Sequence, residues 1–232
     1  MIVLVILVVS VILLPVANLF LEGIFRNVLA LVAAVVFMVS TSLIVLNQNN
    51  HFGMEKVTTT NEIPLVSSSS ESPVDLLLYK ALGNGEDKIY LYQTDAKKTE
   101  LKQTGQDKTT NLVEMGNQEA ILEKQTTHWQ YKSHFYELLF EVEKEQSFFI
   151  SEKNTFRLPN SWLVINTDQA EKMGKELKNN QDKIQADAKA YIGENLKKAM
   201  MENPEMTKEE QQSIAEELTT AFQKQMIEDL IK

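Results

Sequence analysis

The residues of this chain most able to bind a metal ion or move a proton are its histidines, His51, His128 and His134. His128 and His134 lie six residues apart in a strand-like stretch, so both side chains could face the same side of a sheet. A zinc site needs at least a third ligand, and the nearby Glu137 does not create an HExxH-like spacing. The sequence therefore predicts no metal site.

Other catalytic patterns are missing as well. The chain has no cysteine, which excludes a thiol nucleophile, and it has no Gly-x-Ser-x-Gly elbow. Gly83-Asn84-Gly85 is typical of a turn, not of a phosphate-binding loop. The acidic pairs Glu209/Glu210 and Glu216/Glu217 fall on the polar face of a predicted helix, where solvation explains them. We therefore predict neither an enzyme nor a cofactor.

The charge of the chain excludes a nucleic-acid partner. The formal net charge is −9, and because Glu22 and Arg26 cancel, the whole excess lies beyond residue 46. Such a region is repelled by the phosphates of nucleic acids and by anionic lipid.

Two apolar runs open the chain, over residues 1–21 and 28–46. Each matches the roughly 20 residues that a helix needs to cross a bilayer. Only a short turn containing Glu22 and Arg26 separates them, so residues 1–46 are predicted to form a transmembrane helical hairpin. Ala30 and Ala34 form a small-xxx-small pair that allows close helix packing. A cleaved signal peptide is the less favoured alternative for the first run, because no basic residue precedes it.

The positive-inside rule sets the predicted orientation. Arg26 lies in the turn, close to the membrane edge, whereas Lys56 lies about ten residues beyond the second run. We therefore expect a two-pass protein of the cell membrane with its turn inside and its soluble domain outside. The absence of cysteine fits an exported protein of a Gram-positive cell envelope.

The remaining chain divides into three parts by pattern. Residues 47–75 are rich in Ser, Thr and Pro and are predicted to be a polar tether, with a short edge strand at Ile63–Val66 as an alternative. Residues 76–166 show short apolar runs with turn signals, including Asn84-Gly85, and no long helix between them. This pattern predicts an antiparallel β-rich domain whose strands include Tyr136–Val142.

From residue 167 to residue 232 the apolar period becomes helical. Thr167 or Asp168 is the expected N-cap of a first helix, and Asn203-Pro204 is expected to end it. Thr207 with Glu210 reads as a capping box before a second helix. The overall prediction is a membrane-anchored α+β protein that ends in a pair of amphipathic helices.

Aromatic residues give the remaining functional indication. Trp129 and Tyr131 belong to an aromatic-rich stretch that could line a ligand groove, although a sheet core uses the same residues. Phe222 and Met226 lie on the apolar stripe of the last helix, which either covers the sheet or binds a partner. These four residues are the candidate ligand or partner surface.

In its architecture, and in stretches such as YKSHFYELLF (131–140) and LPNSWLVI (158–165), the chain resembles an uncharacterised family of small two-helix membrane proteins of lactic acid bacteria and enterococci. Members of that family look to be encoded, in some genomes, beside multidrug-type transporters of the major facilitator class. The resemblance implies a non-enzymatic accessory or assembly protein of the cell envelope that contacts the lipid bilayer and a membrane protein such as a transporter. An extracytoplasmic ligand-binding or sensing domain is the alternative hypothesis.

Overall fold

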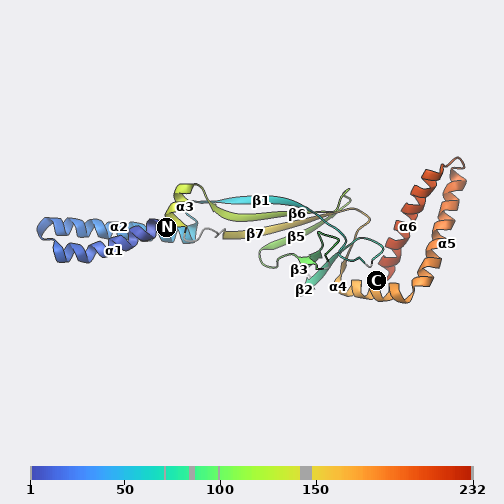
Figure 1. Cartoon of the computed structure of the whole chain (residues 1–232), viewed down its shortest axis with the longest axis horizontal. Coiled ribbons are helices and arrows are strands. Elements are labelled where there is room, and N and C mark those ends of the chain that lie inside the picture. Colours follow the sequence, from blue (N-terminus) through green and yellow to red (C-terminus); the bar gives the residue numbers. More distant parts are fainter. Residues whose placement is uncertain (1, 71, 84–86, 99, 142–147, 231–232) are drawn as a thin grey trace. The chain divides into compact units, whose positions relative to one another are not determined.

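The computed structural model describes the chain except for residues 1, 71, 84–86, 99, 142–147 and 231–232 (Figure 1). The helices are α1 (Ile2–Phe20), α2 (Gly23–Asn50), α3 (His134–Phe140), α4 (Thr167–Asn179), α5 (Gln181–Glu202) and α6 (Lys208–Leu230). The strands are β1 (Met54–Pro64), β2 (Leu76–Leu82), β3 (Asp87–Tyr92), β4 (Lys102–Gln103), β5 (Thr109–Met115), β6 (Ile121–Tyr131), β7 (Phe148–Leu158) and β8 (Leu163–Asn166). Contacts divide the chain into two units, Met1–Thr59 with Thr126–Ser151, and Thr60–Gln125 with Glu152–Lys232.

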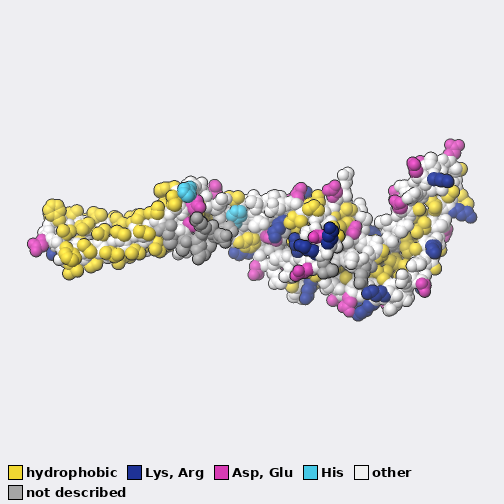
Figure 2. All heavy atoms as spheres, in the orientation of Figure 1, with side chains coloured by type: hydrophobic (Ala, Val, Ile, Leu, Met, Phe, Trp, Pro, Cys, Tyr) yellow, Lys and Arg dark blue, Asp and Glu magenta, His cyan; other side chains and the backbone are white. Residues whose placement is uncertain are grey.

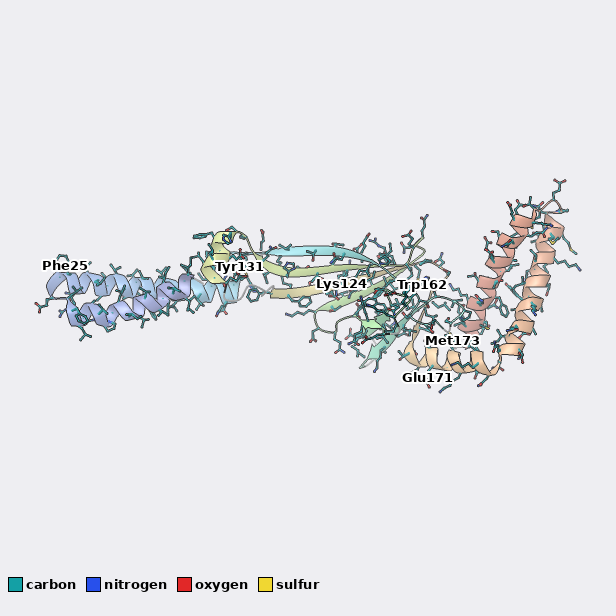
Figure 3. The ribbon with its side chains drawn as sticks, in the orientation of Figure 1. Phe25, Lys124, Tyr131, Trp162, Glu171 and Met173 are labelled. Carbon is teal, nitrogen blue, oxygen red and sulfur yellow. The ribbon has the colours of Figure 1, made fainter. Side chains whose placement is uncertain are left out.

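The first unit begins with the helical hairpin that the sequence predicted. Among the described residues, α1 and α2 are long and apolar enough to cross a membrane. Their outward surface is covered by hydrophobic side chains, and the labelled Phe25 lies near the turn between them (Figures 2 and 3). Few of their residues are buried, so neither helix resembles the core helix of a soluble domain.

The two hairpin helices pack along a narrow seam of small residues. The most buried positions recur every seven residues, at Val3, Ser10 and Ala17 on α1 and at Ala33, Ser40 and Asn47 on α2. A seven-residue repeat is the spacing of a coiled-coil seam, and small side chains let the two backbones approach closely. On α2 the most buried residue of the seam is Ala33, at 2% exposure, whereas the predicted Ala30 and Ala34 beside it are only half-buried.

Much of the segment that we predicted to be a polar tether is strand β1. The strand begins three residues after the last turn of α2, and its central residues, Val57 to Thr60, are β-branched, which suits an extended backbone. Thr58 Oγ1 lies 2.9 Å from Thr127 Oγ1 on β6, so the hydroxyls that suggested a solvated spacer instead form a cross-strand pair. Composition alone did not reveal this partner.

The strands form two mixed four-stranded sheets, ordered β1-β6-β7-β5 and β4-β3-β2-β8. The prediction of an antiparallel domain is therefore wrong in part: β2 pairs antiparallel with β3, but β2 with β8 and β5 with β7 are parallel. We had expected parallel pairs to need a crossover helix. Here the chain between β2 and β8 passes through β5, β6 and β7 of the other sheet, so the long connection that a parallel pair needs is supplied mainly by strands. The Asn84-Gly85 turn signal lies outside the described residues.

Two hydrophobic clusters in the second unit show how its layers pack. One joins the two sheets through Leu77, Tyr90 and Phe156. The other lies on the opposite face of β2 and β8, where Leu76 and Ile165 contact residues of α4 and α6. The alternation of side chains along β2 and β3 explains both, because successive residues point to opposite faces. Figure 3 labels one residue from each cluster, Trp162 and Met173.

Helix α3 occupies the place of a predicted strand, Tyr136–Val142, whose last residue is outside the described part of the chain. The run His134–Phe140 has consecutive apolar residues that no period-2 pattern can place on one face. Tyr136 and Phe140, four residues apart, both pack on the ring of Phe52. That spacing is the helical one, and it brings the two rings to the same side.

The predicted C-terminal pair of helices is three helices. The expected first helix breaks at Asn180, which has φ −116° and ψ 23° and donates from Nδ2 to the Glu176 carbonyl oxygen. The N-cap of α4 also precedes the predicted Thr167 or Asp168, because Asn166 forms the capping box with Gln169. The predicted capping box of the last helix is confirmed, with the Glu210 amide donating to Thr207 Oγ1 at 3.2 Å.

One arginine connects all four strands of the first sheet. Arg157 on β7 forms an ion pair with Glu123 on β6, and lies 3.4 Å from Glu62 on β1 and 3.9 Å from Glu114 on β5. Without Arg157, Glu62 on β1 and Glu123 on the neighbouring β6 would lack the cation between them, and like charges on neighbouring strands destabilise a sheet.

We expect Arg157→Met to lower the free energy of unfolding by about 1–3 kcal/mol, because it leaves the largely buried Glu123 carboxylate without its partner. Chemical unfolding of the detergent-solubilised chain measures the loss. Adding Glu123→Gln to Arg157→Met should recover part of it. An unchanged unfolding midpoint in Arg157→Met would show that the ion pairs contribute nothing to stability.

Candidate functional site

The second unit contains an open groove of about 630 Å³ between its three helices and the loop before β2. Its lining residues are Ser72, Pro73, Gly174, Leu177, Lys178, Gln181, Ile184, Gln185, Ala188, Thr219, Phe222, Gln223 and Met226. Two of the four predicted surface residues, Phe222 and Met226, are therefore brought to one site. The volume lies in the range of about 300–1,000 Å³ that ligand sites occupy.

Helical spacing explains why three separate helices line the groove. The lining residues of α6 are Thr219, Phe222, Gln223 and Met226, which share one face of a helix, and those of α5 recur in the same way from Gln181 to Ala188. Met173 on α4 and Ile227 on α6 are buried in the cluster beneath, at 3% and 0% exposure. These two residues hold α4 and α6 against the sheet, and the neighbouring turns are left to form the groove.

The floor of the groove is apolar and its rim is rich in amides. Leu177, Ile184 and Phe222 supply apolar surface, and the Phe222 ring also packs against Tyr191, with centroids 5.5 Å apart. Gln181, Gln185 and Gln223 supply uncharged donors and acceptors. A ligand that matches this arrangement has an apolar stripe flanked by polar groups. An amphipathic helix that binds in a groove has such a stripe.

The other two predicted residues are Trp129 and Tyr131. They lie in the first unit, where their side chains contact other residues of that unit. The Trp129 ring stacks on His51, with centroids 4.3 Å apart and planes at 14°, and Lys56 Nζ lies 5.3 Å from its centroid. Burial raises the pKa of the Tyr131 hydroxyl, and a hydrogen bond with the Asn47 side chain opposes that shift. Both side chains therefore make contacts within the first unit, and their role as a ligand or partner surface stays a prediction.

Trp129 belongs to a cluster that we call the aromatic junction, made of His51, Phe52, Trp129, Tyr136 and Phe140. Asn47, in the last turn of α2, donates from Nδ2 to the Phe52 carbonyl oxygen at 2.8 Å. His51 ends α2 in the left-handed conformation, with φ 54°. The sequence reasoning considered His51 only as a metal ligand; its place directly after an apolar helix and before a strand was the signal of a structural role.

His134, one of the histidines considered above as a possible metal ligand, lies beside a carboxylate. His134 Nδ1 lies 2.9 Å from Glu137 Oε2 on the same short helix. Over the residues that the structure describes, no three His, Asp or Glu side chains lie close enough to hold a metal ion.

Comparison with known proteins identifies the family. A family model described as Domain of unknown function (DUF4811) matches residues 22–173, well over half of the chain. The chain belongs to the DUF4811 family. No curated protein and no solved structure matches it. The resemblance to an uncharacterised family is confirmed to this extent.

The DUF4811 match divides the candidate residues. It includes α2, both sheets and α3, and with them Trp129, Tyr131 and the aromatic junction. It ends at Met173, before the first residue that lines the groove, apart from Ser72 and Pro73. The junction is thus part of the DUF4811 domain, and the groove is built mainly by this chain's helices beyond it.

Proposed function

We propose that this DUF4811 protein is a non-enzymatic, two-pass accessory protein of the cell envelope whose C-terminal helices bind a helical segment of a partner protein in the same membrane. The observation that carries the proposal is the open, apolar groove between α4, α5 and α6. Three helices that leave one apolar side open can be completed by a fourth, as in a helical bundle. A transporter is the kind of partner that the family resemblance implies.

The hairpin of α1 and α2 supports the membrane location that we propose for this protein. An exposed apolar hairpin needs lipid around it, and its seam of small residues is the type of interface that holds helices together in a bilayer. Placing Arg26 inside puts the groove outside the cell. The protein is then an anchored arm that meets its partner at the extracellular surface.

The test uses the absence of cysteine in the natural chain. In full-length protein in native membranes, Gln185→Cys places a thiol-reactive photocrosslinker at the groove, and the exposed Met201→Cys places one elsewhere on α5. We expect Gln185→Cys, but not Met201→Cys, to give a reproducible adduct with an integral membrane protein. An impermeant thiol reagent applied to intact cells should label the Gln185→Cys thiol; labelling only after lysis would overturn the outside orientation.

A matched pair of glycine substitutions tests whether the groove itself binds. Among the described residues, nothing lies within 4 Å of a Cβ built at Gly174, which lines the groove, or at Gly193, which does not. Both are helical, so leucine should not weaken either helix. We expect Gly174→Leu to fill the groove and abolish the adduct, and Gly193→Leu to preserve it. Persistence of the adduct in Gly174→Leu would refute the helix-binding role.

The groove also has the size of a small-molecule site, which favours an extracytoplasmic ligand-binding domain as the second candidate. The same crosslinking experiment separates the two. Adducts with a small molecule alone, again lost in Gly174→Leu, would replace the accessory role with the ligand-binding one.

A further inference from the structure

Apolar side chains are exposed around helix α3, at the end of the hairpin where α1 begins and α2 ends. Phe135 and Leu138 on α3 are 64% and 46% exposed, and Phe148 and Phe149 at the start of β7 are 40% and 45% exposed. Among the described residues of the first unit, nothing covers these four side chains, and Phe148 lies at the end of α2, with its ring centroid 6.4 Å from that of His51. Surfaces of this kind mark interaction sites.

Several contacts fix α3 beside the hairpin. Helix α3 contacts α1, and the Phe52 ring meets Tyr136 and Phe140 edge-on, with centroids 5.8 and 6.3 Å apart. The Asn47 side chain holds the Phe52 carbonyl oxygen, as described above, which ties this packing to the last turn of α2. Tyr136 and Phe140 therefore face inward, and Phe135 and Leu138 are left on the outward side.

The exposed apolar side chains near α3 adjoin the apolar surface of the hairpin, which indicates that lipid covers both. The exposed apolar surface of α1 and α2 reaches the end where α3 packs (Figure 2). If lipid surrounds the hairpin, the headgroup boundary must lie close to the polar turn that follows Leu46, namely Asn47 to Asn50. Amphipathic helices with Phe or Leu on one face and charged or polar residues on the other lie at that depth. Helix α3 has this character, because His134 and Glu137 accompany its apolar residues.

We propose that α3 and the start of β7 form an interfacial collar, in which Phe135, Leu138, Phe148 and Phe149 lie in the headgroup boundary of the bilayer that the hairpin crosses. The inference rests on the proposed membrane anchor. Helix α3 is far too short to span a bilayer, so it lies along the surface. The collar holds the first residues of β1 and the last residues of β6 at the membrane without a flexible tether.

The test is fluorescence quenching in lipid vesicles of phosphatidylcholine. Full-length single-cysteine variants Phe135→Cys, Met38→Cys and Glu137→Cys are labelled with an environment-sensitive dye, and the vesicles carry a spin label either near the headgroup or near the end of the acyl chain. Interfacial helices sit about 5–10 Å into the boundary, so we expect about a twofold loss of Phe135→Cys fluorescence with the shallow spin label and little with the deep one.

The two other positions separate failure of the collar from failure of the anchor. Met38, 58% exposed on α2, should show the reverse preference, because it lies near the middle of the apolar run. Glu137, on the polar side of α3, should be quenched less than Phe135. Quenching of Met38→Cys without quenching of Phe135→Cys overturns the collar and leaves the anchor standing. No quenching at either position overturns both. Energy transfer between labelled copies in place of lipid quenching would assign the surface to a second copy of the chain and overturn the lipid assignment.

Discussion

Deletion of residues 204–232 is expected to destroy the cooperative unfolding of the second unit instead of releasing a folded domain without its arm. The deletion removes Ile227, which is fully buried against Leu76, Ile165 and Met173, and the half-buried Met226. Each large side chain lost from a core costs roughly 2–5 kcal/mol. The total stability of a domain is only about 5–15 kcal/mol. Helix α6 is therefore part of the fold as well as a wall of the groove.

Hydrogen exchange of the full-length and truncated proteins in detergent measures this effect, because β2 and β8 provide the face that Ile227 covers. We expect their amides to lose protection in the truncated chain. Ile227→Ala should produce a smaller loss at the same strands, and Met201→Ala, at a site 67% exposed, should produce none. Full protection of β2 and β8 after the deletion would mean that the last helix is a removable arm.

Local sequence patterns predicted the elements well where one partner or one period decides the structure. The two apolar runs are helices, the Thr207–Glu210 capping box starts α6, and Tyr90 and Leu91 face different clusters as their alternation required. Each of these features depends on residues within a few positions of one another. Short-range sequence patterns were therefore sufficient to predict them.

The errors concern features whose partners are distant in the sequence. Thr58 in the expected tether pairs with Thr127, and β2 pairs in parallel with β8, where Leu76 lies opposite Leu163. The groove likewise combines Ser72 with residues of α4, α5 and α6. The sequence shows whether such residues are polar or apolar. Which residues they contact depends on the order of the strands and on the packing of the helices. The stacking of His51 on Trp129 is another contact between distant residues that nothing local revealed.

Gly53→Ala is expected to disrupt the aromatic junction more strongly than any other conservative change near the hairpin. Gly53 has φ +84°, and a Cβ at this position would lie 2.5 Å from Tyr136 Cδ1. The left-handed backbone alone costs a residue with a Cβ roughly 1–2 kcal/mol. The overlap adds about 1–3 kcal/mol, because the Tyr136 ring is held by Phe52 and cannot move away without losing that contact.

Gly23→Ala is the matched control, since Gly23 has a similar φ of +61° and, in the described part of the chain, no atom within 4 Å of the added Cβ. Unfolding in detergent can be followed by Trp129 fluorescence in a Trp162→Phe background, which removes the only other tryptophan. We expect Gly53→Ala to be destabilised beyond Gly23→Ala by the cost of the overlap.

The double variant Gly53→Ala/Tyr136→Ala decides the cause. If the overlap with the ring is responsible, the Gly53→Ala substitution should cost less in the Tyr136→Ala background than in the natural one, by the amount that separates it from Gly23→Ala. Equal costs in the two backgrounds would show that α3 does not pack on the turn after α2. The interfacial collar depends on that packing, because it is what keeps Phe135 and Leu138 on the outward side of α3. The collar thus requires a positive coupling between Gly53 and Tyr136. If Phe135→Cys were quenched in the absence of that coupling, other contacts would have to hold α3 at the end of the hairpin.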